Sequence, residues 1–332
     1  TSINSEIKIH FLTANSRIII CFFARMKAIP NSTKQFLIFL VKIVIVGGAF
    51  YFIYNQLANN DKLDWQQFIV LFKKNWSVLG ILFLLLLSFL NRYFEILKWQ
   101  NLVSVIKPIS VGTSSKQVLG ALTAGIFTPN GVGEYAGKAL FFEKSQTKKI
   151  VFLNLICNGI QLILSVFFGV LGLLYLGFTI WVLAIIGLCI LLSGIFYFSK
   201  KIQIKGYSIE SLMDKINEIP KKIHQKNILL AVLRYLVFSH QYYFLFLAFD
   251  VHLPYFTLMA TITTVYFLAS SLPTFQFLDF AVKGSVAVYF FGLLHINEWI
   301  VIFISTLMWF LNIVLPVVIG SYFVLNFKTQ KK

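Results

Sequence analysis

Residues 150–176 have the sequence IVFLNLICNGIQLILSVFFGVLGLLYL, an apolar run without one charged side chain. A helix needs about 20 such residues to cross the hydrocarbon core of a bilayer. The whole chain of 332 residues shares this character, because 58% of its residues are hydrophobic, 12% are charged and the mean hydropathy is +0.81. A soluble domain carries about 25% charged residues. The sequence therefore predicts an all-α polytopic integral membrane protein and excludes a soluble enzyme, a disordered or fibrous protein and a secreted disulfide scaffold.

Full-length spans are predicted wherever an apolar run is long enough to cross the bilayer. Six runs meet this condition: 36–54, 76–99, 150–176, 178–198, 227–249 and 299–325. We expect residues 26–332 to form a single polytopic domain that starts near Met26, and residues 1–25 to be a leader or a non-native segment. The domain is expected to divide into a half at about 36–198 and a half at about 227–325, joined by a basic loop at 199–226.

Two further apolar stretches are each interrupted by a proline. The stretch 117–142 is broken by TPNGVG at 128–133, and the stretch 255–293 is broken by SSLPT at 270–274. The halves of the first are too short to cross a bilayer. Bare backbone at membrane depth is tolerated only when it is buried in protein or lines a polar cavity. We therefore expect two re-entrant hairpins or discontinuous helices.

Basic residues predict the orientation of the chain. Lysine and arginine outnumber aspartate and glutamate by 29 to 12, and lysines crowd the loop 199–226 while the connections at 177, 250–254 and 294–298 have none. Cytoplasmic loops of membrane proteins carry this excess. The expected arrangement is a multi-pass protein of the plasma (bacterial inner) membrane with both termini in the cytoplasm. The first hairpin then enters from the cytoplasm and the second from outside, and contact with anionic headgroups explains the charge better than nucleic-acid binding.

The two breaks resemble each other. Glu134-Tyr135-Ala136-Gly137-Lys138 follows the first proline, and Asp279-Phe280-Ala281-Val282-Lys283 follows the second, 145 residues later. Opposite entry sides make this an inverted repeat, and secondary transporters built on inverted repeats bind their substrates at broken helices near the midplane. Helix N-termini at the breaks would suit an anion such as a lipid phosphate. An open alternative is that the acid–lysine pairs only stabilise the two kinks.

The candidate substrate-binding residues come from the two breaks and from two neighbouring spans. They are Pro129, Asn130, Gly131, Gly133, Glu134, Lys138, Arg92, Asn158, Pro273, Asp279 and Lys283. Arg92 belongs to a charged span end that is either an anchor or the rim of a headgroup site, where Lys98 is expected to snorkel towards the headgroups. Asn158 lies on a polar helix face suited to interhelical hydrogen bonds or to a cavity wall. Arg234 is expected at the membrane interface.

The sequence contains no motif that is typical of a metal or cofactor site. The three cysteines are isolated in apolar stretches, and the five histidines form no HExxH or HxxxH pair. We expect neither a metal nor another cofactor. There is also no catalytic motif, and the chain is predicted not to be an enzyme.

With the motif Pro129-Asn130-Gly131-Val132-Gly133-Glu134 and Lys138 in view, the chain resembles the transmembrane-region family of lysylphosphatidylglycerol synthases. This family is the flippase half of MprF-type proteins and also occurs as stand-alone YbhN-like and AglD-like membrane proteins. The resemblance covers most of residues 36–325, although residues 274–278 lack the glycines usual at the family's second break. We expect no counterpart of the synthases' aminoacyl-transferase domain. The resemblance implies lipid translocation or lipid binding.

Two classes of function therefore stay open. The first is a flippase-like or lipid-binding transporter that handles an anionic or glycosylated headgroup at the two broken helices. The second is a membrane-embedded enzyme or an accessory subunit for lipid-linked envelope assembly. The expected partners are a membrane phospholipid or glycolipid, with a homo-oligomer or a glycosyltransferase or lipid-synthesis partner left open.

Overall fold

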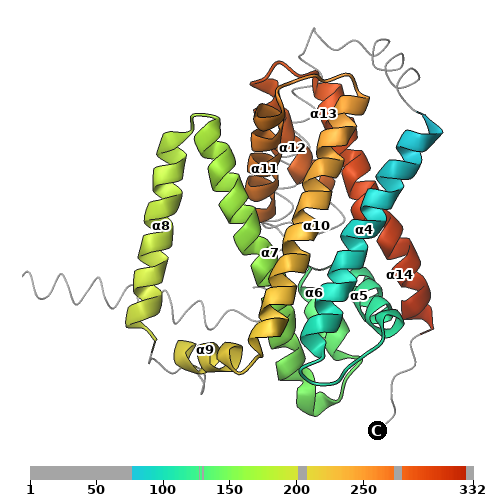
Figure 1. Ribbon diagram of the computed structural model, residues 1–332, viewed down its shortest axis with the longest axis vertical. Helices are drawn as coiled ribbons and strands as arrows, with labels where there is room; N and C mark the ends of the chain where they lie inside the picture. The colour runs from blue at the N-terminus through green and yellow to red at the C-terminus, as the bar shows by residue number, and fades with distance from the viewer. Residues whose placement is uncertain (1–76, 127, 129–130, 201–207, 273–278, 327–332) are drawn as a thin grey trace, which may run out of the picture. The chain divides into compact units, whose positions relative to one another are not determined.

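The computed structural model describes residues 77–126, 128, 131–200, 208–272 and 279–326 (Figure 1). The regular secondary structure of these residues is helical, without a strand, which confirms the all-α prediction for this part of the chain. The helices are α4 (Val78–Val103), α5 (Val111–Gly125), α6 (Val132–Ala139), α7 (Thr147–Tyr175), α8 (Thr179–Phe198), α9 (Ile209–Asn217), α10 (Lys221–Ala248), α11 (Tyr255–Ser271), α12 (Asp279–Gly292), α13 (Glu298–Trp309) and α14 (Leu315–Leu325). The predicted leader 1–25 and the predicted first span 36–54 lie outside the described residues.

Five stretches of the described chain are long and apolar enough to cross a membrane. They are Val78–Val103, Lys144–Tyr175, Thr179–Phe198, Lys221–Ala248 and Glu298–Val324. They match the five later predicted spans closely, because hydrophobic length alone determines both the prediction and the helix. The five helices indicate a multi-pass membrane protein.

The last of these stretches is not a uniform α-helix. A five-residue π-helical segment, Phe310–Val314, joins α13 to α14. A π-turn changes the register of the backbone hydrogen bonds, and such segments occur frequently at functional sites. Asn312 lies in the middle of this one and is buried.

Both predicted breaks are present as interruptions between helices. α5 ends at Gly125 and α6 begins at Val132, and α11 ends at Ser271 where α12 begins at Asp279. Gly131 precedes α6 in the left-handed conformation, with φ of 65°, which a residue without a Cβ adopts at little cost. The two halves of the first segment, with 15 and 8 residues, are short as predicted, and re-entry into a membrane stays a prediction.

The two broken segments pack against opposite ends of α7. The α5–α6 segment meets the first half of α7, where Lys138 and Tyr135 contact Asn154 and Asn158. The α11 helix meets the second half, where a Cβ on Gly172 would come within 2.5 Å of the Ala260 carbonyl oxygen. Asn154 and Gly172 are 18 residues apart, about 27 Å along a helix. Figure 1 shows α5 and α6 at the bottom of the helices and α11 and α12 at the top.

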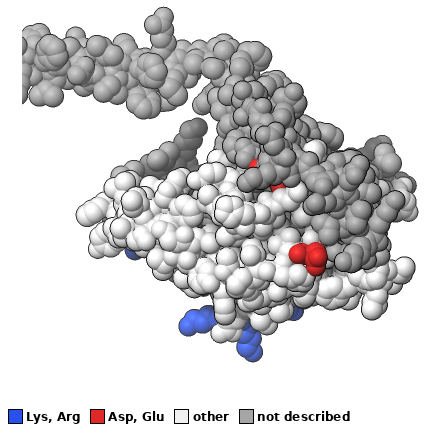
Figure 2. Space-filling view, turned by 90° about the horizontal axis from the view of Figure 1, so that it is seen from above, with Lys and Arg blue, Asp and Glu red and all other residues white. Residues whose placement is uncertain are grey.

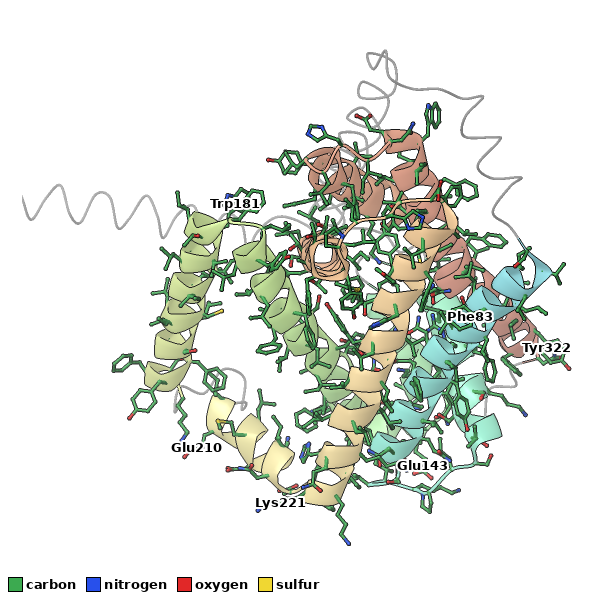
Figure 3. All side chains as sticks on the ribbon, turned by 45° about the horizontal axis from the view of Figure 1, so that its top comes forward. Phe83, Glu143, Trp181, Glu210, Lys221 and Tyr322 are labelled. Carbon is green, nitrogen blue, oxygen red and sulfur yellow. The ribbon has the colours of Figure 1, made fainter. Side chains whose placement is uncertain are left out.

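Charge is distributed unevenly along the helices. The exposed lysines of the described chain follow α4, lie in α5, in α9 and early in α10, or lie in the 3-10 helix Lys144–Gln146 and at the start of α7. Figure 3 shows Lys221 and Glu210 at the end opposite Trp181. In the view from above, the described surface that is not covered is mostly uncharged, with an acidic patch and with basic side chains mainly along the lower edge (Figure 2). This asymmetry agrees with the loop charges on which the predicted orientation rests.

Candidate functional site

Two adjoining cavities lie where both broken segments end. The first, of about 100 Å³, is lined by residues of α4, α7, α10, α11, α12, α13 and the π-segment. The second, of about 300 Å³, is lined by residues of α4 to α7, α10, α11 and the π-segment. The residues that line both are Arg92, Gln161, Arg234, Tyr266 and Ile313. Each cavity exceeds the roughly 15 Å³ that a single water needs, so both can hold a group of a ligand.

Glu95 is the electrostatic centre of the site. Its carboxylate oxygen Oε2 lies 2.6 Å from Arg234 Nη1 and 3.3 Å from Lys98 Nζ. The side chains of Glu95 and Lys98 are 6% and 0% exposed, whereas that of Arg234 is 21% exposed. A buried charge is tolerated only when it is paired. The carboxylate of Glu95 therefore pairs with two cations. Lys98 is fully buried, and Arg234 also lines both cavities.

Two sequence-based expectations are wrong at this point. Lys98 was expected to snorkel towards the headgroups, but its ammonium group is buried and bonds Glu95 and Gln161. Arg234 was expected at the membrane interface, but it lies in the middle of α10, where its guanidinium bonds Glu95 and Asn91. Arg234 is held inside the protein by Glu95 and Asn91 of the distant helix α4. Lys98 pairs with Glu95 on its own helix and is buried beside Gln161 of α7.

Arg92 is placed by the π-segment of the last span. Its Nη2 donates to the carbonyl oxygen of Asn312 at 2.5 Å. The side chain of Asn312 continues the network, since its Oδ1 accepts from Asn91 at 2.6 Å and its Nδ2 donates to Gln241 at 2.9 Å. The Arg92 Nε is buried and has no hydrogen-bond partner among the described residues. The network thus fixes one side of a guanidinium whose Nε can still donate.

The ends of both broken segments reach the larger cavity. Gly131 and Glu134 line it from the first break, and Ser270 lines it from the second. Thr128 shapes the first break, because its hydroxyl accepts from the backbone N–H of Gly133 at 2.8 Å. A Cβ on Gly133 would come within 2.8 Å of the Ala124 carbonyl oxygen. This close approach explains why glycine stands here.

Lys138 takes a position apart from the cavities. Its Nζ donates to Asn154 Oδ1 at 2.6 Å and lies 4.6 Å from the ring centroid of Trp99. The side chain is fully buried, and Lys138 is not among the described residues that line either cavity. Its contacts join α6 to α4 and α7, and they give it a part in positioning the first broken segment.

The second copy of the acid–lysine motif is described only in part. Lys283 lines the smaller cavity and places its Nζ 5.6 Å from the ring centroid of Tyr266. Asn158 lines the larger cavity and donates to the Tyr135 hydroxyl at 3.3 Å. Three of the other candidate residues (Pro129, Asn130 and Pro273) and the side chain of Asp279 lie outside what the structure describes. The structure therefore brings together Arg92, Gly131, Glu134, Asn158 and Lys283.

Several lining residues escaped the sequence analysis. Tyr235, Tyr242 and Tyr266 line the smaller cavity, and the Tyr235 hydroxyl is buried without a partner among the described residues. In a chain with 17% aromatic residues, no sequence signal separates these tyrosines from those that face lipid. Arg234 did carry a signal, because an arginine seven residues inside an expected span is costly unless it is paired.

The donors at the site are suited to binding an anion. No group of three or more histidine, cysteine or acidic side chains that could hold a metal ion occurs in the described part of the chain. Arginine presents N–H donors in a planar fork that fits a phosphate or a carboxylate. Low-dielectric surroundings strengthen these interactions. An anion that enters the smaller cavity meets two such forks and an ammonium group.

No protein-family model matches this chain, and no curated protein matches it either.

Proposed function

We propose that the protein binds the headgroup of an anionic lipid in the two adjoining cavities and carries it across the membrane as a flippase-like transporter. The observation that carries the proposal is the meeting of both broken segments at cavities lined by Arg92 and Arg234. The five apolar spans supply the membrane setting. We also propose that the chain is related to the transmembrane region of lysylphosphatidylglycerol synthases, which its motif at residues 129–138 resembles. The broken segments are then the re-entrant hairpins of an inverted repeat.

Three features support a lipid as the cargo. Polar groups at the cavities are enclosed by helices whose outer faces are apolar, so a headgroup can be bound while its acyl chains stay in the bilayer. The two broken segments pack at opposite ends of α7, and each half of the chain contributes one broken segment to the lining of the cavities. Intramembrane ionisable residues mark substrate pathways in many transporters. The proposal places the lysine-rich end in the cytoplasm and the protein in the plasma membrane.

The test is lipid translocation in proteoliposomes. Purified protein is reconstituted with a trace of fluorescent phosphatidylglycerol, and a membrane-impermeant quencher reports the fraction of label that reaches the outer leaflet over time. Arg234→Met removes a cavity-lining cation while Lys98 still neutralises Glu95. We expect this variant to translocate at least about tenfold more slowly, since a hydrogen bond to a charged group contributes about 1.5–3 kcal/mol.

The control is Lys222→Met, which removes an exposed lysine at the start of α10. It should translocate at the wild-type rate. Arg234→Lys, which keeps the charge and loses the fork, should fall between the two. Translocation by the wild-type protein no faster than in protein-free liposomes, or by Arg234→Met as fast as by wild type, would contradict the proposal.

A further inference from the structure

The two cavities differ in charge. The described residues that line the smaller cavity include Arg92, Arg234 and Lys283 and no acidic residue, although the charge of Arg234 is paired with Glu95, which lines the larger cavity. The larger cavity is lined by the same two arginines together with Glu95 and Glu134, so its charges cancel. A ligand that fills both cavities therefore meets a cationic compartment and, next to it, a neutral one. Arg92 and Arg234 stand at the junction.

The cationic compartment has two buried donors without an acceptor among the described residues. Tyr235 lines it and is 3% exposed, and its hydroxyl is buried without a hydrogen-bond partner among the described residues. The same holds for Arg92 Nε, which is buried and unpartnered. A buried polar group without a partner costs about 1–3 kcal/mol, so two such donors at one cavity point to an anion that accepts from both.

The neutral compartment is polar without being charged overall. The lining residues Asn158 and Gln161 have amides, Ser165 and Ser270 have hydroxyls, and Glu134 has a carboxylate. Amides and hydroxyls both donate and accept, and carboxylates accept, which matches the mixed donors and acceptors of a hydroxylated ring or chain. An ammonium group would gain no net attraction from a lining whose charges cancel, and it would lie beside two arginines.

We propose, on the basis of the lipid-binding function above, that the ligand is a lipid whose phosphate carries a neutral, hydroxyl-rich substituent such as a sugar or a polyol. The phosphate occupies the cationic compartment and accepts from Arg92, Arg234 and the Tyr235 hydroxyl. The substituent occupies the neutral compartment beside Glu134 and Asn158. This assignment excludes headgroups that carry an amine or a quaternary ammonium.

The experiment compares lipids of identical acyl chains on the purified full-length protein by native mass spectrometry in mild detergent. Phosphatidylinositol carries both groups, phosphatidic acid only the phosphate, glucosyl diacylglycerol only the sugar, and phosphatidylcholine a phosphate with an ammonium. We expect phosphatidylinositol to bind at least about fivefold more tightly than each of the others, since one hydrogen bond changes affinity by roughly two- to tenfold.

Variants assign the two groups to their compartments. Asn158→Leu should lower phosphatidylinositol binding to the level of phosphatidic acid and leave phosphatidic acid unchanged. Ser270→Ala serves the same purpose with a smaller change of volume. Tyr235→Phe should weaken the binding of both lipids about equally and should not reduce stability, because the lost hydroxyl has no partner among the described residues. Tyr243→Phe, on the same helix and outside both cavities, is its matched control.

The outcomes separate this inference from the proposed function. Equal binding of phosphatidylinositol and phosphatidic acid, both tighter than phosphatidylcholine, would overturn the hydroxylated substituent and leave the anionic-lipid function standing. Binding of phosphatidylcholine as tight as that of all the others would refute the proposed function itself. Inositol 1-phosphate binding as tightly as phosphatidylinositol would overturn the assignment to a lipid, since the acyl chains would then contribute nothing.

Discussion

Replacing Glu95 by glutamine tests the electrostatic centre of the site. The change keeps the size of the side chain and removes the one negative charge that lies within 3.3 Å of Lys98 and 2.6 Å of Arg234. At an effective dielectric constant of about 20, unit charges roughly 3 Å apart attract by about 5 kcal/mol. Removing one partner of a buried ion pair costs about 3–5 kcal/mol net of solvation. We expect Glu95→Gln to lower the free energy of unfolding by that amount.

The assay is reversible unfolding of the purified protein in mixed micelles, followed by circular dichroism. The double variant Glu95→Gln, Lys98→Met should regain about 2 kcal/mol relative to Glu95→Gln alone, within the range of coupling energies for residues in contact. It removes the sealed cation and leaves only Arg234, whose partial exposure allows water to solvate it. Glu210→Gln on the exposed face of α9 should change the free energy of unfolding by less than about 0.5 kcal/mol. A loss below about 1 kcal/mol for Glu95→Gln, or a double variant that is simply additive, would refute this reasoning.

Two further predictions concern packing and orientation. Gly320→Ala should lower the free energy of unfolding by about 1–3 kcal/mol, because the new Cβ would overlap the Leu119 carbonyl. Gly159→Ala, where nothing lies within 4 Å of the new Cβ, should be neutral or slightly stabilising. Thermal unfolding in detergent compares the two variants. With the native cysteines replaced, Lys215→Cys should resist an impermeant external thiol reagent and His252→Cys should react in intact cells, and external labelling at position 215 would invert the proposed orientation.

The spans and the breaks could be predicted because local composition determines them. An apolar run of sufficient length forms a helix in a membrane wherever it occurs, so α7 and α8 were located from the sequence to within a few residues. The break before Val132 was equally local, since proline and glycine interrupt a helix whatever packs around it. The predicted re-entry of the two segments from opposite sides of a membrane stays a prediction, and the opposite packing of α6 and α11 along α7 agrees with it.

The contacts of the site could not be predicted because they join distant parts of the chain. Glu95 and Arg234 are 139 positions apart, and nothing in either span identifies the other as its partner. Lys138 illustrates the same limit. Its spacing from Glu134 suggested a pair on one helix face, but a lysine on a short helix is also within reach of neighbouring helices, and here it contacts Asn154 and Trp99.

The measurement that tests the central claim most directly is photocrosslinking with an anionic lipid that carries a diazirine beside its phosphate. After illumination in nanodiscs, mass spectrometry identifies the labelled peptides. The account predicts labels around Gln161 on α7 and Tyr266 on α11, which line both cavities, and loss of these labels in Arg234→Met. Labels confined to exposed apolar residues of α8 such as Leu183 and Leu191 would show lipid only on the outer surface and would contradict a headgroup site inside the protein.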